Sequence, residues 1–131
     1  MLVFLVRHAH ADPGEPDELR MLSERGQQEA RDLAERLAAH SSPPRIVLAS
    51  PLLRARETAV AIASASAAEL RVEDRLAPGA TAADLQEAVA DVPGPIAAVG
   101  HQPDCSEIAV ALTGLDPGFP TGGMAELDLE T

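Results

Sequence analysis

Residues 2–8 of the chain read LVFLVRH. The first five are an unbroken apolar run rich in strand-forming residues, and the run stops at Arg7 and His8. A strand without polar positions is typical of a parallel sheet that helices cover on both faces. The stretch therefore predicts a buried β-strand over residues 2–6, with a cation and an imidazole at its carboxyl end.

The same pattern recurs along the chain. Apolar runs at 46–49 and 96–99 predict two more buried strands, and weaker strands are expected at 70–72 and 124–129. Helices are expected over 24–40, from Ser50-Pro51 through Ala63, over 82–92 and over 104–112, with Ser23, Ser50 and Thr81 as N-caps and Gly114 as a stop. This alternation predicts one domain over residues 1–131: a three-layer α/β/α sandwich with a mostly parallel central sheet and helices on both faces.

Composition restricts the partners and the compartment. The chain has 131 residues, 46% of them hydrophobic, which is enough for a core, and its formal net charge is -11. That charge argues against nucleic acid or an anionic membrane as a partner. A single cysteine excludes an internal disulfide, and the N-terminal apolar run is too short for a signal peptide. We expect a cytoplasmic protein and favour a monomer.

Functional side chains follow the three buried strands. Arg7 and His8 follow the first, Ser50 follows the second with Arg54 a few residues on, and His101 follows the third. Because ligands of open α/β sheets bind at the carboxyl ends of the strands, these groups should converge on one edge. Arginine forks bind phosphate oxygens in pairs, and a neutral imidazole is a good nucleophile near pH 7. We also expect Ser50 to bind the substrate, and the helix start after it would add backbone donors for an anion.

Five stretches together resemble a known family. They are residues 5–9 (LVRHA), 22–26 (LSERG), 50–59 (SPLLRARETA), 99–103 (VGHQP) and 120–123 (PTGG). The chain resembles the histidine phosphatase (phosphoglycerate mutase-like) superfamily, and most of all its small bacterial phosphohistidine phosphatases. The resemblance extends over nearly the whole chain.

The resemblance implies a mechanism and a set of residues. The residue at the position of His8 is phosphorylated in that family, and the residues at Arg7, Arg54 and His101 hold the phosphoryl group. Two steps are expected, in which His8 attacks phosphorus and water then hydrolyses the phosphohistidine. Neither a metal nor an organic cofactor is required. Glu57 and Thr58, beside Arg54, are expected to orient it or to pack.

One departure from the family bears on the substrate. Larger members carry a carboxylate proton donor after the strand near residue 70, whereas residues 76–81 here read LAPGAT. An imidazole leaving group needs much less help from an acid than an alkoxide does. The expected substrate is therefore phosphohistidine of a protein, unless Asp12, Glu15 or Asp104 folds over the pocket as a donor. A phosphomonoesterase for small metabolites and a non-catalytic phosphate-binding module are the alternatives.

Three other residues invite different interpretations. His8 and His10 resemble a metal-binding pair, but the barrels that use such a pair need about 200 residues or more. Cys105 could suggest a cysteine phosphatase, but the arginine that this chemistry needs six positions later is Ala111. We therefore expect Cys105 to be a core residue. His40 is explained by its place in the last turn of a helix.

Overall fold

The computed structural model describes residues 1–129. Its strands are β1 (Leu2–Arg7), β2 (Ile46–Ala49), β3 (Glu69–Val72), β4 (Ile96–Gly100) and β5 (Met124–Asp128). Its α-helices are α1 (Glu24–Ala38), α2 (Leu53–Ser66), α3 (Ala82–Val89) and α4 (Asp104–Thr113), and two short 3-10 helices are η1 (Asp17–Leu19) and η2 (Asp74–Leu76).

The five strands form one sheet in the order β3-β2-β4-β1-β5. The pairs β3–β2, β2–β4 and β4–β1 are parallel, and β5 runs antiparallel to β1 at the edge. The predicted mostly parallel sheet is thus confirmed. The register pairs Arg7 with Gly100, so the residues that follow, His8 and His101, leave the sheet side by side.

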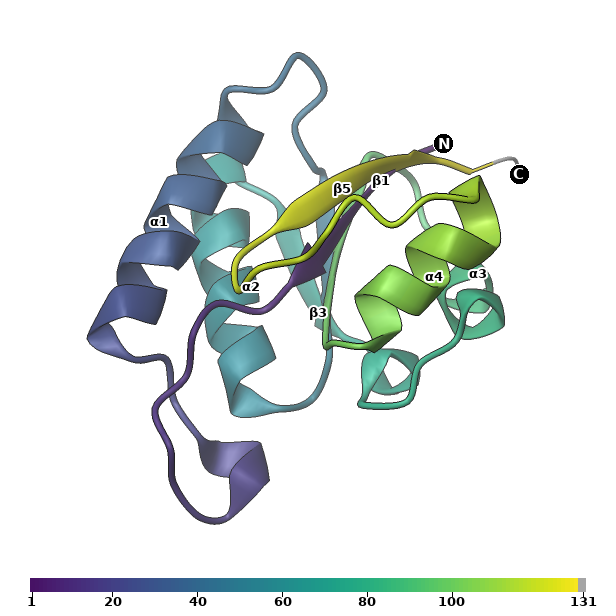
Figure 1. The fold of residues 1–131 in the computed structure, drawn as a ribbon. Helices are drawn as coiled ribbons and strands as arrows, with labels where there is room; N and C mark the ends of the chain where they lie inside the picture. The colour runs from purple at the N-terminus through teal and green to yellow at the C-terminus, as the bar shows by residue number, and fades with distance from the viewer. Residues whose placement is uncertain (130–131) are drawn as a thin grey trace.

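Helices cover both faces of the sheet, as predicted (Figure 1). Val3 and Leu5 belong to the core cluster that also contains residues of α3 and α4. Phe4 belongs to the second cluster, which contains residues of α1 and α2. Both sets of β1 side chains are therefore buried, which explains why residues 2–6 have no polar position.

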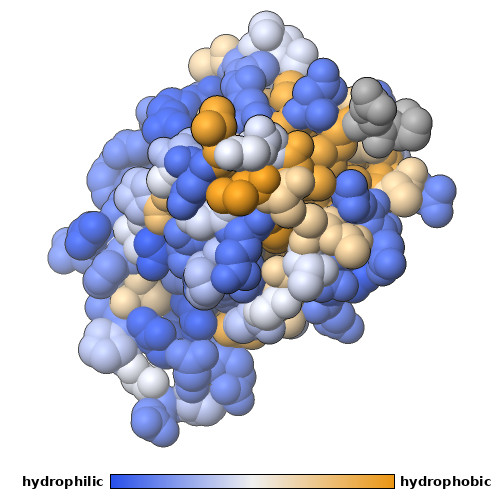
Figure 2. Space-filling model, turned by 45° about the vertical axis from the view of Figure 1, so that its right-hand side comes forward, coloured by the Kyte–Doolittle hydropathy of each residue, from blue (hydrophilic) through white to orange (hydrophobic). Residues whose placement is uncertain are grey.

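The surface is mostly polar. In Figure 2, hydrophilic side chains cover most of the face shown, and apolar side chains gather in its upper part. Within residues 1–129, no helix is long and apolar enough to cross a membrane.

Three of the predicted helix boundaries are wrong. Helix α1 ends at Ala38 rather than at residue 40. Helix α2 begins at Leu53 with Leu52 as N-cap, so Ser50 is not the N-cap and Pro51 is not the first helical residue. Leu52 is still extended, with φ -69° and ψ 141°. Helix α3 ends at Val89 rather than at residue 92, although its predicted cap, Thr81, is confirmed and forms a capping box with Asp84.

Candidate active site

The predicted residues come together at the carboxyl edge of the sheet. The rings of His8 and His101 lie with their centroids 5.2 Å apart. Arg7 is the last residue of β1, and Arg54 lies in the first turn of α2. The segment after β1 extends away from the sheet, forms η1 and returns to α1 (Figure 1). The site is therefore built from loops that follow three neighbouring strands.

The ring of His8 is held in one tautomer. Its Nδ1 lies 2.7 Å from the carbonyl oxygen of Ala9. A carbonyl oxygen can only accept, so Nδ1 carries the proton and Nε2 keeps its lone pair. Burial lowers the pKa of His8 to about 4; the bond to Ala9 opposes this shift, and the positive charges of Arg54 and Arg7 add to it. His8 is therefore a neutral imidazole at pH 7, with Nε2 free to attack.

His101 is buried against Ser50. Its Nε2 lies 2.7 Å from the Ser50 hydroxyl oxygen, which also accepts a hydrogen bond from the backbone N–H of Leu52. Burial lowers the pKa of His101 to about 4, and His8 and Arg54 act in the same direction. Ser50 is fully buried, and its hydroxyl contacts His101 instead of capping the helix. Direct binding of substrate by Ser50 stays a prediction.

The two arginines are fixed by contacts to loops. Arg7 donates from Nη1 to the carbonyl oxygen of Phe119 at 3.0 Å. Its Nε is buried and has no hydrogen-bond partner within residues 1–129. Arg54, only 7% exposed, donates to the backbone oxygen of Asp17 at 2.9 Å and to the Asp17 carboxylate at 3.2 Å. The buried Nε of Arg7 is thus a donor that an anion at this edge could satisfy.

Thr58 connects the segment after β1 to the first turn of α2. Its hydroxyl accepts a hydrogen bond from the backbone N–H of Ala9 at 3.0 Å and donates to the backbone oxygen of Arg54 at 2.8 Å. The backbone of Ala9 is thereby held at its nitrogen by Thr58 and at its carbonyl oxygen by His8. Thr58 is fully buried, which fits the expectation that it orients its neighbours.

The loop over residues 120–123 supports the Arg7-His8 backbone. The N–H of Gly122 lies 3.1 Å from the carbonyl oxygens of both Arg7 and His8, and Arg7 N donates to the oxygen of Gly123. At Gly123, a Cβ would lie 2.8 Å from Pro120, so any larger residue would force this tight loop open. The loop therefore limits movement of the nucleophile's backbone.

The sequence of residues 3–93 matches the histidine phosphatase superfamily (branch 1). The chain belongs to this superfamily. The structure of the protein histidine phosphatase SixA complexed with tungstate is 27% identical, with a TM-score of 0.87 over 99% of this chain and 89% of that one. SixA of Agrobacterium tumefaciens is 31% identical, with a TM-score of 0.84 over 97% of this chain and 90% of that one.

A mycobacterial glucosyl-3-phosphoglycerate phosphatase in complex with VO3 has the same fold. It is 22% identical, with a TM-score of 0.76 over 97% of this chain and 90% of that one. Comparison with curated proteins gave no match. Family membership and these similarities identify the chain as a phosphatase with the phosphoglycerate mutase-like α/β fold.

The carboxylates of this phosphatase are placed as follows. Asp12 and Glu15 are exposed. Asp104, 6% exposed, accepts hydrogen bonds from the backbone N–H groups of Gly79 and Ala80 at 2.8 and 3.2 Å. Asp104 thus anchors the loop in which larger members carry their acid. Asp17 is the carboxylate that pairs with Arg54. It lies in the acidic stretch 12–18, for which the sequence favours a solvated loop, with selection of a cationic or protein substrate as the alternative.

The remaining candidates have other partners. The Nδ1 of His10 lies 2.6 Å from the hydroxyl oxygen of Ser23. His40 lies beyond α1, which ends at Ala38, so its predicted place in the last helical turn is wrong; its Nε2 lies 2.8 Å from the carboxylate of Glu126. Cys105 is fully buried in the core, as expected, and burial raises the pKa of its thiol to about 12.

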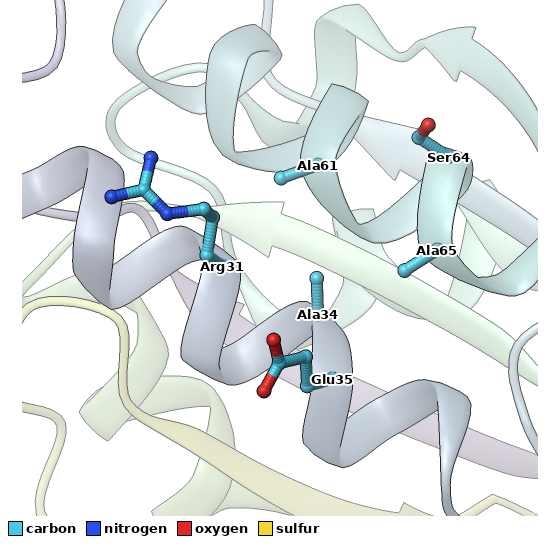
Figure 3. A pocket seen from close by; sticks show the side chains of 6 residues that line it. All are labelled: Arg31, Ala34, Glu35, Ala61, Ser64 and Ala65. Atoms are coloured by element: carbon cyan, nitrogen blue, oxygen red, sulfur yellow. The ribbon is translucent and has the colours of Figure 1, made fainter.

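A groove of about 340 Å³ lies between α1 and α2 and contains none of these groups. Figure 3 shows the side chains that line it: Arg31, Ala34, Glu35, Ala61, Ser64 and Ala65. It contains one arginine, one carboxylate and one serine hydroxyl but no histidine, so the edge of the sheet, where two histidines and two arginines meet, is the better candidate site.

Proposed function

We propose that this phosphatase removes the phosphoryl group from phosphohistidine of a protein through a covalent intermediate on His8. The observation that carries the proposal is the neutral ring of His8 with its unprotonated Nε2. The ring lies beside His101, and the positive charges of Arg7 and Arg54 lower its pKa. A nucleophile without charge, surrounded by fixed cations, is what transfer of an anionic phosphoryl group requires.

The reaction has two steps. The Nε2 lone pair of His8 attacks phosphorus in line, the bond from phosphorus to the leaving nitrogen breaks, and that nitrogen takes the electron pair. Water then attacks the phosphorus of phosphorylated His8, which releases orthophosphate and restores the imidazole. The guanidinium groups of Arg7 and Arg54 and the imidazole of His101 stabilise the charge on the phosphoryl oxygens in both transition states.

The placement of carboxylates favours phosphohistidine over a phosphate ester. Asp104 is engaged with two backbone N–H groups, and Asp84 caps α3. Hydrogen bonding to Arg20, together with the charge of Arg54, holds the pKa of Asp17 below its usual range, so Asp17 is ionised at neutral pH and has no proton to give. An alkoxide would leave slowly from such a site, whereas a phosphohistidine ring that is protonated on its other nitrogen leaves as neutral imidazole.

The comparisons support the same substrate class. The structure that superposes with a TM-score of 0.87 is a protein histidine phosphatase. The phosphatase for glucosyl-3-phosphoglycerate is 22% identical, and this likeness carries the fold alone. A small phosphorylated metabolite, the alternative from the sequence, is the second candidate substrate, and we favour the phosphorylated protein. That neither nucleic acid nor a membrane is a partner stays a prediction from the net charge of -11.

The test is phosphate release from a phosphohistidine peptide and from a phosphoserine peptide of matched sequence. We expect fast release from the first, slow release from the second, and loss of both in His8→Ala. Equal rates with the two peptides would assign a general phosphomonoesterase. Undiminished activity in His8→Ala would refute the assignment of His8 as the nucleophile.

A further inference from the structure

Asp17 places a negative charge beside the arginine that is expected to bind phosphate. Its carboxylate lies 3.2 Å from Nη2 of Arg54 through one oxygen and 3.1 Å from Nη1 of Arg20 through the other. Its backbone oxygen accepts from Nη1 of the same Arg54 at 2.9 Å. Both terminal nitrogens of Arg54 thus contact this residue, and the carboxylate is fixed relative to the guanidinium.

The carboxylate nevertheless faces solvent. The side chain of Asp17 is 62% exposed, whereas that of Arg54 is 9% exposed. A substrate that approaches Arg54 from solvent therefore comes close to the exposed carboxylate of Asp17 first. Each carboxylate oxygen accepts one guanidinium N–H and, by its lone pairs, can accept a second hydrogen bond.

We propose that Asp17 is a specificity-determining residue that selects phosphoramidates with a positively charged leaving group, such as protonated phosphohistidine, over phosphate esters. The inference rests on the proposed function of the His8 site and adds to it the group that distinguishes the substrates. Asp17 acts on the part of the substrate that departs, while His8 acts on phosphorus.

Charge complementarity is the physical reason. A phosphate ester brings only negative charge to Arg54, so its phosphoryl oxygens are repelled by the neighbouring Asp17 carboxylate. A phosphohistidine protonated on its second ring nitrogen brings a positive ring to the same carboxylate. That ring N–H can donate to a free lone pair of Asp17, and this charge-assisted bond offsets the repulsion.

The proton balance is consistent with this role. As the bond between phosphorus and the leaving nitrogen breaks, the electron pair moves onto the ring and cancels its positive charge. The proton stays on the second ring nitrogen, and the product is neutral imidazole. Asp17 therefore neither gives nor takes a proton; it favours the protonated form of the substrate, which is the reactive one.

The test uses Asp17→Asn, which removes the charge and keeps an oxygen for Arg54. Glu18→Gln is the matched control, because Glu18 is adjacent and exposed and has no side-chain hydrogen bond or ion pair within the described part of the chain. We measure kcat/KM for the matched phosphohistidine and phosphoserine peptides, and inhibition by orthovanadate. Loss of one charge–charge contact should lower the preference for phosphohistidine about tenfold and tighten orthovanadate inhibition, while Glu18→Gln changes neither.

Different results would count against different claims. If Asp17→Asn lowers kcat/KM equally for both peptides and does not tighten orthovanadate inhibition, Asp17 only holds Arg54 in place and the inference is wrong. If the wild-type enzyme shows no preference for phosphohistidine, the proposed substrate is wrong. In that case unchanged orthovanadate inhibition in Asp17→Asn would also overturn the electrostatic role of Asp17.

Discussion

Thr58→Val removes one hydroxyl from the hydrogen bonds that hold the nucleophile and keeps almost the same side-chain shape. The lost oxygen accepts from Ala9 N at 3.0 Å and donates to Arg54 O at 2.8 Å, in a fully buried position. The Arg54 oxygen can keep its helical hydrogen bond, but the Ala9 N–H loses its acceptor. The Ala9 carbonyl, which binds Nδ1 of His8, belongs to the loop that this contact fixes.

The size of the effect follows from the burial of Ala9. A buried donor without a partner costs about 1–3 kcal/mol, so we take ~2 kcal/mol. Unfolding entropy is about 2.1 cal/mol/K per residue, or roughly 0.28 kcal/mol/K for 131 residues. The midpoint of thermal unfolding should therefore fall by about 7 °C. Because the ring of His8 loses part of its alignment, we also expect kcat to fall about tenfold.

Calorimetry measures the first effect, and steady-state kinetics with a saturating phosphohistidine peptide measures the second. Thr113→Val is the control, because Thr113 makes a similar bond to the carbonyl of Ala109 on the exposed side of α4. It should change stability by only a few tenths of a kcal/mol and leave kcat unchanged. If Thr58→Val behaves like this control, Thr58 does not orient the nucleophile.

Four further predictions concern the pH dependence of activity, the pH dependence of stability, packing and thiol reactivity. Burial lowers the pKa of both His8 and His101 to about 4, so both rings are neutral above that pH. For a substrate whose charge does not change, kcat/KM should therefore stay level down to about pH 5 and fall below it. The unfolded histidines take up protons near pH 6.5, so the free energy of unfolding should decrease as the pH falls from about 6.5 to about 4, as denaturant titrations at several pH values would show. Gly26→Ala should destabilise the protein by more than ~2 kcal/mol, because the added Cβ would lie 1.8 Å from a backbone oxygen. Gly14→Ala is the control: its Cβ would meet nothing closer than 3.9 Å, so this variant should unfold at the same denaturant concentration as the wild type. Cys105 should resist alkylation in the folded protein and react on unfolding, because burial raises the pKa of its thiol to about 12; rapid labelling without denaturant would contradict this.

The sequence predicted the elements that local patterns determine. The apolar run at residues 2–6 has no polar position because both faces of β1 are covered, as is typical of a layered α/β fold. Ser23 and Thr81 cap helices as expected, because a cap depends only on residues within one turn. His8 and His101 meet because the parallel register brings the ends of β1 and β4 together.

The contacts that the sequence did not reveal join segments far apart in the chain. Ser50 precedes a proline and therefore looks like an N-cap, but its hydroxyl lies against His101, which is 51 positions away. Asp17 is one of several acids in a polar loop, and only the folded path of η1 brings it to Arg54. The two amides that Asp104 binds belong to the loop before α3. No local periodicity encodes such partners.

The most direct test of the central claim is to trap the phosphoryl group on the enzyme. The protein is mixed with a phosphohistidine peptide, quenched in base within milliseconds, digested and analysed by mass spectrometry, with His8→Asn as the control. The account predicts an acid-labile phosphoryl group on His8 in the wild type and none in the variant. A wild-type enzyme that turns over rapidly without ever carrying phosphate on His8, or that carries it on another residue, would contradict the account.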